Sequence, residues 1–390
     1  MTRLHIQLVS NQLAGNLIPA LMERPEYAAL IVTPDMAAKA RQLRELEEEA
    51  GIVVRTFENA PDADLPRLHE FALDVLDGLP AVDELVLNLT GGNKLMALGF
   101  LEILRDTVHR RIYTDTAHGR LEHLPVGSER ADPPTPLGHV LDVPISLRAQ
   151  GFRYRSAVSA GEDWWRAAGE RKQVAKKLAE VARDHGDFLG ALNRVASRAL
   201  DREGRLVAHE QAFDTPPRGR WAQNLRWLCD EGLLDWEEGA AAVTFLDEAH
   251  ARFLNGGWLE EYVYHRLRDE GIDDVALGVE GTWDGTDGAR NELDVVAVHA
   301  NRLLVVECKT ARHGRDDALD DQQLYKLDSI GDTLRGFFGS SWMVSARTPT
   351  QSMGERARQH RIRLIGPDEL PRLRAIVREW KASMEGAGSA

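Results

Sequence analysis

The amino-acid sequence predicts an α/β protein that begins with an open, doubly wound sheet and ends with a mixed α/β domain. Two observations predict this class. Short apolar runs alternate with helical patterns in residues 1–125, and a helical pattern near the end precedes an apolar hairpin pattern. The 390 residues suffice for two or three domains. The apolar content of 43% is typical of globular domains, so we expect most of the chain to fold.

Five apolar runs in residues 1–125 are expected to form the strands of the first sheet. They read LHIQLVS, AALIVTP, IVVRTF, ELVLNLT and RRIYTD, and they are apolar almost throughout, as strands covered on both faces are. Four segments between them carry apolar residues at helical spacing: NLIPALMERP, MAAKARQLRELEEEA, LPRLHEFALDVLDGL and KLMALGFLEILRD. This alternation predicts a doubly wound domain over residues 1–150.

The remainder of the chain divides into a helical segment and a second α/β domain. The Pro- and Gly-rich stretch PVGSERADPPTPLGHVLDVP predicts a linker, and residues 151–255 are expected to be mainly helical. Within them, a helix, a small wing and a closing helix suggest a winged-helix-like module, and simple structural bridging is the alternative. From residue 256 to 390 we expect a helix, a strand near VALGVEG, the hairpin ELDVVAV–HANR–LLVVECKT, a helix in DDQQLYKLDSIGDTLRG and the strands SWMVSA and IRLIG.

Composition excludes several classes of protein. The net charge of −14 argues against a constitutive duplex binder with a broad basic face, but it is compatible with an enzyme that handles nucleic acid locally. No apolar run approaches the roughly 20 residues that span a bilayer, and the first residues do not form a signal peptide, so we expect a cytoplasmic protein without a membrane partner. Cys229 and Cys308 lack metal-ligand spacing and are expected to be reduced thiols.

The hairpin in the last domain carries a candidate catalytic site. Glu307 and Lys309 are two residues apart on an apolar strand, so both side chains leave by the same face. Antiparallel pairing across the HANR turn brings Asp294 close to Glu307. Two converging carboxylates repel each other unless a divalent cation lies between them, and an all-oxygen ligand set favours Mg²⁺ or Mn²⁺ over Zn²⁺. The chemistry expected is metal-assisted hydrolysis, with Lys309 orienting the nucleophile or stabilising charge.

The preceding helix, GGWLEEYVYHRL, is expected to add a third carboxylate. Glu260 shares a face with Val263, Tyr264 and Leu267, whereas Glu261 aligns with the polar face of His265 and Arg268. We therefore assign Glu260 to the metal site together with Asp294 and Glu307.

A second candidate site follows the fourth strand, where NLTGGNK precedes a helix. Ligands of doubly wound sheets bind at the carboxyl ends of the strands, where helix amino termini attract anions. Thr90, Gly91, Gly92, Asn93 and Lys94 are candidate ligand-binding residues, although the motif is also compatible with a plain tight turn. The spacing matches neither a Walker A loop nor G-x-G-x-x-G. Ser10 and Asn11 end the first strand at the same edge and equally fit helix caps. Further groups there are Gln12, Thr33 and Asp115.

These motifs carry two family resemblances. The first resemblance is to the PD-(D/E)XK nucleases, and it rests on Asp294 and on Glu307-Cys308-Lys309 in an apolar hairpin. A helix with WLEE precedes this hairpin, and a helix with Gln323 and Lys326 follows it. For Gln323 and Lys326 a solvated helix face is the alternative. NLTGGNK after the fourth strand resembles the CARF domain, the Rossmann-like sensor of type III CRISPR systems. The combination looks like a CRISPR accessory effector nuclease. It implies a homodimer whose paired CARF domains bind cyclic tetra-adenylate or a related cyclic oligoadenylate.

The sequence therefore leads us to expect a cyclic-oligoadenylate-activated, metal-dependent endonuclease of CRISPR antiviral defence that cleaves DNA, RNA or both. The alternatives are an ungated restriction- or repair-type nuclease and a non-catalytic, nucleotide-sensing transcriptional regulator. The intact set of Asp294, Glu307 and Lys309 weighs against a relic nuclease fold, and the acidic net charge weighs against a regulator.

Overall fold

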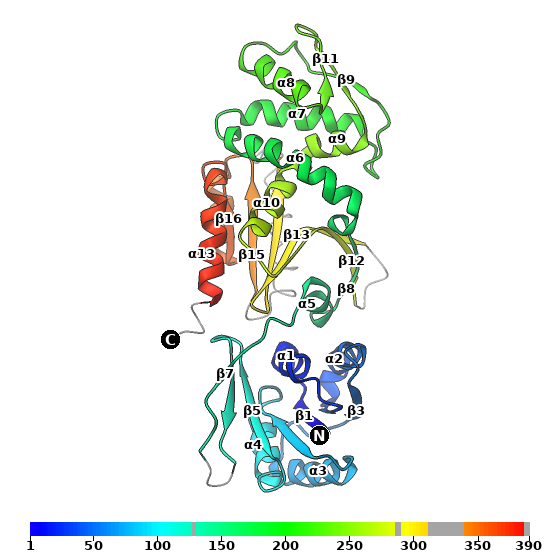
Figure 1. Cartoon of the computed structure of the whole chain (residues 1–390), viewed down its shortest axis with the longest axis vertical. Helices are drawn as coiled ribbons and strands as arrows, with labels where there is room; N and C mark the ends of the chain where they lie inside the picture. Colours follow the sequence, from blue (N-terminus) through cyan, green and yellow to red (C-terminus); the bar gives the residue numbers. More distant parts are fainter. Residues whose placement is uncertain (127–129, 285–289, 311–338, 386–390) are drawn as a thin grey trace.

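The computed structural model describes residues 1–126, 130–284, 290–310 and 339–385. Two sheets and a small helical module follow one another along the long axis of the molecule. The first sheet lies at one end, the second sheet lies in the middle and the helical module lies at the other end (Figure 1). The predicted fold class, with a Rossmann-like sheet and a second mixed sheet, is confirmed.

The first sheet has the strand order β3-β2-β1-β4-β5-β6-β7. Its parallel strands are β1 (Arg3–Leu8), β2 (Tyr27–Ile31), β3 (Val53–Phe57), β4 (Glu84–Asn88) and β5 (Arg110–Asp115). Two antiparallel strands, which we did not predict, close the edge: β6 (Arg120–Leu124) and β7 (Thr135–Pro136).

Helices cover both faces of this sheet, as a doubly wound fold requires. Apolar side chains of α1 (Ala14–Glu23) and α2 (Ala37–Glu49) form one core cluster, which includes Leu17 and Leu43. Those of α3 (Leu65–Gly78) and α4 (Lys94–Ile103) form another, which includes Leu68 and Phe100.

The second sheet has the strand order β16-β15-β14-β13-β12-β8. Its strands are β8 (Phe152–Ala157), β12 (Asp274–Trp283), β13 (Asn291–His299), β14 (Arg302–Lys309), β15 (Ser340–Ser345) and β16 (Ile362–Ile365). Helices α10 (Trp258–Asp269) and α13 (Leu373–Glu385) pack against each other. Helices α5 (Val143–Ala149) and α12 (Gln351–Gln359) contribute instead to the core cluster that contains Leu17 and Leu43.

One expected boundary is wrong. Residues 152–157 were placed in a helical segment, but they form β8, which pairs with β12 at the edge of the second sheet. The strand alternates between buried and exposed side chains and contains two arginines, because one of its faces meets solvent. The second α/β unit therefore takes in residues on both sides of the helical module.

The helical module contains the small wing and the closing helix that the sequence predicted. It consists of α6 (Glu162–Val181), α7 (Gly186–Ala199), β9 (Glu210–Ala212), α8 (Arg220–Asp230), β10 (Leu234–Asp235), β11 (Ala242–Phe245) and α9 (Glu248–Arg252). The strand order β10-β11-β9 is that of a three-stranded antiparallel wing. Helix α6 packs along α10, so the module is also joined structurally to the second sheet.

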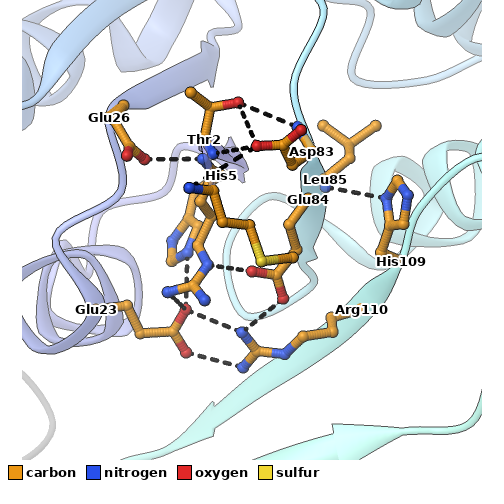
Figure 2. A network of polar contacts seen from close by, with 11 residues as sticks. Thr2, His5, Glu23, Glu26, Asp83, Glu84, Leu85, His109 and Arg110 are labelled. Atoms are coloured by element: carbon orange, nitrogen blue, oxygen red, sulfur yellow. Dashed lines mark hydrogen bonds and ion pairs between the residues drawn. The ribbon is translucent and has the colours of Figure 1, made fainter.

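The amino ends of β1, β4 and β5 are held together by an ionic network (Figure 2). Arg110 contacts Glu23 at 2.8 Å and Glu84 at 3.3 Å, and the His5 ring lies 3.1 Å from Glu23. Burial raises the pKa of Glu23, but hydrogen bonds with His5 and Arg110 outweigh burial and lower this pKa to about 2. This edge is structural, and it leaves the opposite, carboxyl edge of the strands for binding.

None of the helices in the described ranges combines the length and apolar character that crossing a bilayer requires. Cys229 and Cys308 are free thiols, as expected.

Gln7 of β1 and Glu47 of α2 form an isolated polar pair in the core of the first domain. Gln7 Nε2 donates to Glu47 Oε1 at 2.7 Å, and both side chains are fully buried. Burial raises the pKa of Glu47 to about 8, because the hydrogen bond from Gln7 only partly compensates the lost hydration of the carboxylate.

We predict that Glu47 makes the protein less stable as the pH rises. An unfolded chain ionises this carboxyl group near pH 4.5, whereas the folded chain holds its proton until about pH 8. The free energy of unfolding should therefore fall between these values, by an amount on the order of a few kcal/mol. Glu47→Gln should lack this component. Urea unfolding of both proteins at pH 5 and pH 8 measures it, and an equal pH dependence would contradict the prediction.

Candidate functional site

The hairpin of β13 and β14 positions the first two carboxylates. Its two-residue turn places Ala300 and Asn301 at φ values of 49° and 60°, the left-handed conformation of the tightest hairpins. The register pairs Val295 with Val306, so Asp294 and Glu307 are the next residues along the two strands. Asp294 Oδ2 accepts a hydrogen bond from the backbone N–H of Cys308 at 2.7 Å, which fixes its carboxylate against β14.

Glu307, Lys309 and Asp294 form a compact charged group at the end of this hairpin. Lys309 Nζ lies 2.5 Å from Glu307 Oε1, and both side chains are largely buried. Burial lowers the pKa of Lys309, but the carboxylates of Glu307 and Asp294 outweigh burial and raise it, so Lys309 stays charged. Burial and the nearby Glu307 raise the pKa of Asp294 to about 7.

Glu260 of α10 faces the same group. Burial, together with the carboxylates of Asp294 and Glu292, raises its pKa well above the ordinary value. Its electrostatic interactions with Asp294 and Glu307 put Glu260 near the hairpin carboxylates, and its assignment to a metal site stays a prediction.

The neighbouring Glu261 differs from expectation. We placed it on an exposed polar face with His265 and Arg268, but Glu261 is only 5% exposed. Its carboxylate binds Arg171 of α6 at 2.6 Å, and His265 lies 3.0 Å from the Ala168 carbonyl oxygen. Glu261 and His265 thus pack against the polar groups of α6, whereas Arg268 on the same face is exposed.

Glu292 is a fourth carboxylate that we did not predict for this site. It lies two residues before Asp294 on β13, so both side chains leave by the same face. It raises the pKa of both Glu260 and Asp294. The sequence could have predicted this, because residues two apart on a strand, such as Glu292 and Asp294, share a face.

A break at Gly256 directs α10 toward the hairpin. Gly256 has φ 120°, and a Cβ atom on it would lie 2.7 Å from Thr310 Oγ1. Asn193 of α7 donates to both Thr310 Oγ1 and the Asn255 carbonyl oxygen at 2.8 Å. The end of β14 and the start of α10 are thus tied together through the helical module.

A cleft of about 680 Å³ opens beside Glu260 and Glu292. It lies between the helical module and the second sheet. Its other lining side chains include Trp164, the cations Arg202 and Arg252, and the carboxylates Glu203 and Glu248. Arg252 pairs with Glu248 at 2.9 Å.

The donor set fits a hard divalent cation. Glu260, Asp294 and Glu307 offer carboxylate oxygens. Burial, and after it the repulsion between neighbouring carboxylates, raises the pKa values of Glu260 and Asp294, and a cation between the groups would offset both effects. Oxygen ligands of this kind are preferred by Mg²⁺ and Mn²⁺.

The residues predicted to bind a ligand in the first domain gather at the carboxyl edge of β1 and β4. Asn11, Asn93 and Lys94 are exposed there, and Ser10 and Gly92 are partly exposed. Gly92 has φ 67°, which a glycine adopts at little cost.

Three of the predicted ligand-binding residues, Thr90, Gly91 and Asn93, make contacts within the protein, so they do not serve ligand binding alone. Thr90 Oγ1 donates to Asn88 Oδ1 at 2.6 Å and accepts from the Thr114 backbone at 2.7 Å. Asn93 caps α4 by accepting from the Met96 N–H. A Cβ atom on Gly91 would lie 1.8 Å from the Leu8 carbonyl oxygen, so this glycine serves close packing on β1.

The buried side-chain amides of Asn16 and Asn88 form a hydrogen-bond network beneath this loop, which we did not predict from the sequence. Asn88 Nδ2 donates to the Gly15 carbonyl oxygen and to Asn16 Oδ1, at 2.9 and 3.1 Å. Asn16 Nδ2 in turn donates to the Leu8 carbonyl oxygen at 2.8 Å. These bonds hold the start of α1 against the ends of β1 and β4.

The other side chains expected at this edge differ in their surroundings. Asp115 pairs with His118 at 2.7 Å, and Thr33 is buried at the start of a short 3₁₀ turn. Gln12 lines a small cavity shared with the second domain. Gln323 and Lys326 lie outside the described residues.

Comparisons with known proteins identify the second domain. Residues 247–384 match the family model of the Card1-like endonuclease domain. This range contains all four of the residues Glu260, Asp294, Glu307 and Lys309. No curated protein matches the chain significantly.

Three solved structures share the fold. Protein VC1899 from Vibrio cholerae aligns with 23% identity over 98% of this chain and 99% of its own, with a TM-score of 0.83. Can2 from Sulfobacillus thermosulfidooxidans, solved in complex with cyclic tetra-adenylate, aligns with 26% identity over 95% of both chains, with a TM-score of 0.74. A type III CRISPR defence DNA nuclease activated by cyclic oligoadenylate aligns with 19% identity over 88% of this chain and 45% of its own, with a TM-score of 0.52.

These findings agree with the two resemblances found in the sequence. The chain is similar over 95% of its length to Can2, which was solved with cyclic tetra-adenylate, and its residues 247–384 match the Card1-like endonuclease domain.

Proposed function

We propose that this protein is an endonuclease of CRISPR antiviral defence, activated by a cyclic oligoadenylate and dependent on Mg²⁺ or Mn²⁺. The observation that carries the proposal is the convergence of three carboxylates and Lys309 within the segment that matches an endonuclease domain. A PD-(D/E)XK arrangement of Asp294, Glu307 and Lys309 is part of the proposal.

Each residue has a role that follows from its geometry. Glu260, Asp294 and Glu307 would hold the cation, which when bound activates a water molecule and neutralises phosphate charge. Lys309 keeps its positive charge 2.5 Å from Glu307, where it can orient the attacking water or stabilise the charge that develops on the phosphate. The hydrogen bond from the Cys308 N–H holds Asp294 in place.

The cleft beside the carboxylates supports a nucleic-acid substrate. Arg202 offers a cation to a phosphate group, and Trp164 offers an aromatic face to a base. Arg252 lines the same cleft but pairs with Glu248 at 2.9 Å. The lining is acidic on balance, so the proposed cation between the carboxylates would supply much of the positive charge that a phosphate group meets there. The substrate class is DNA, RNA or both.

The first domain is the proposed sensor. Can2 binds cyclic tetra-adenylate, and we transfer this ligand class to the carboxyl edge of β1 and β4 in the present chain. Ser10, Asn11, Gly92 and Lys94 would contact the ligand, while Thr90, Gly91 and Asn93 shape the loop that presents them. A cyclic ligand with repeated nucleotides suits a pocket shared by two copies of the chain, so we propose a homodimer.

An apolar cluster connects sensor and nuclease. It includes Leu17 and Leu43 of the first domain, Leu147 of α5, and Val296 and Val305 of the second sheet. Arg302, which begins β14, also donates to the carbonyl oxygens of Thr116 and Ala117 at 3.0 and 2.7 Å. Ligand binding can activate the nuclease through these contacts only if the ligand binds the active arrangement more tightly than the inactive one.

We predict that cleavage requires both the ligand and Glu307. The wild-type protein should cleave single-stranded or supercoiled substrates with Mn²⁺ only when cyclic tetra-adenylate is added. Glu307→Ala should lower the cleavage rate at least about 100-fold without weakening ligand binding, because it removes a cation ligand distant from the sensor. Glu355→Ala on α12 is the matched control and should cleave normally.

The other outcomes separate the competing functions. Cleavage without the ligand would show an ungated nuclease. Tight ligand binding without cleavage of any substrate, combined with salt-sensitive binding of duplex DNA in the absence of metal, would show a transcriptional regulator.

We predict that Lys94 contributes to ligand affinity. Its ammonium group is exposed at the first residue of α4, where phosphates are expected. Lys94→Ala should weaken the binding of cyclic tetra-adenylate at least about tenfold, since a charge-assisted hydrogen bond is lost. Isothermal titration measures this effect, with the exposed Lys176→Ala as control. Equal affinities of the two variants would exclude Lys94 from the binding site.

A further inference from the structure

A cluster of two histidines and one aspartate lies at the junction of the two domains, away from the carboxylate site. His139 belongs to the segment between β7 and α5, Asp273 precedes β12, and His299 ends β13. The His139 Nδ1 atom lies 2.8 Å from Asp273 Oδ2, and the His299 Nδ1 atom lies 3.1 Å from Asp273 Oδ1. Three segments distant in sequence thus turn their donor atoms toward one point.

The spacing of these atoms suits a small metal ion. One ring nitrogen from each histidine and a carboxylate oxygen of Asp273 all lie within 4.8 Å of one another. In a tetrahedral Zn²⁺ site the bonds are about 2.0–2.2 Å long, so neighbouring ligand atoms are roughly 3.3–3.5 Å apart. Shifts of less than about 1 Å would bring the three side chains to this geometry. The ring centroids, 5.6 Å apart with planes at 71°, do not obstruct it.

Burial and outer contacts also favour a defined site. The His299 side chain is 2% exposed, whereas those of His139 and Asp273 are 47% and 27% exposed, so one side of the cluster is fixed and the other is open to an entering ion. The Ala300 N–H donates to Asp273 Oδ2 at 2.8 Å, an outer hydrogen bond of the kind that orients metal-binding carboxylates.

We propose that His139, Asp273 and His299 form a zinc site, with water as the fourth ligand. Two imidazole nitrogens and one carboxylate oxygen form a set that Zn²⁺ prefers, unlike the all-oxygen set of the candidate catalytic site. The bound ion joins the segment that leaves the sensor to the end of β13, the strand that carries Asp294. Its role is structural: it fixes the path of the chain between the two domains.

Metal titration tests the site independently of nuclease activity. The parent is the full-length Glu307→Ala variant, freed of metal, so that the catalytic carboxylates contribute less to binding. Co²⁺ replaces Zn²⁺ as a coloured substitute, because its visible absorption is strong in four-coordinate sites and weak in six-coordinate ones. We expect one strongly absorbing Co²⁺ per chain, displaced by Zn²⁺. His139→Ala in this background should lower the affinity at least about 100-fold. His250→Ala, which removes a histidine paired with a single aspartate, should not change the affinity.

His139→Asp separates a metal ligand from a simple ion-pair partner. Without metal, its carboxylate would repel Asp273 and lower the melting temperature. As a ligand it would recover Zn²⁺ binding, so Zn²⁺ should raise the melting temperature of His139→Asp but not that of His139→Ala. Absence of strong Co²⁺ absorption in the parent, unchanged affinity in His139→Ala, or no effect of Zn²⁺ on His139→Asp would overturn the proposal.

Discussion

The antiparallel pairing of β13 with β14 is the constraint on which the candidate catalytic site depends. The register that aligns Val295 with Val306 places Asp294 beside Glu307 and lets the Cys308 N–H bind the Asp294 carboxylate. A slip by one residue would turn these groups to the opposite face of the sheet. The tight turn at Ala300 and Asn301 fixes this register, and the break at Gly256 then brings Glu260 over it.

Much of this could be predicted because the signals are local. Apolar runs identify the five parallel strands of the first sheet and the strands from β12 to β16 of the second, and the period of two predicts that Glu307 and Lys309 share a face. The helical period separated Glu260 from Glu261, although it could not tell what Glu261 meets. Its partner, Arg171, lies 90 residues earlier, and no periodicity reports a contact across that separation. Strand β8 was missed for a similar reason, because its pairing with β12 crosses the whole helical module.

The first domain shows the opposite difficulty. The T-G-G-N-K motif predicts a binding loop after β4, but a short motif does not reveal which way a side chain points. Thr90 turns its hydroxyl group toward Asn88 and Thr114, and Asn93 caps α4. The glycines also differ in purpose: Gly91 admits the Leu8 carbonyl oxygen, and Gly92 permits a left-handed turn. The motif therefore describes how the loop is built at least as much as what it binds.

The apolar cluster shared by the two domains has a consequence for modularity. Leu17, Leu147 and Val296 belong to one continuous core, although they come from the first domain, from the connecting helix α5 and from the second sheet. A first domain exchanged for that of a distant relative would therefore present mismatched side chains to α5 and β13. Recombination between such proteins should succeed only when α1, α2 and α5 are inherited together, so these helices form the unit of exchange.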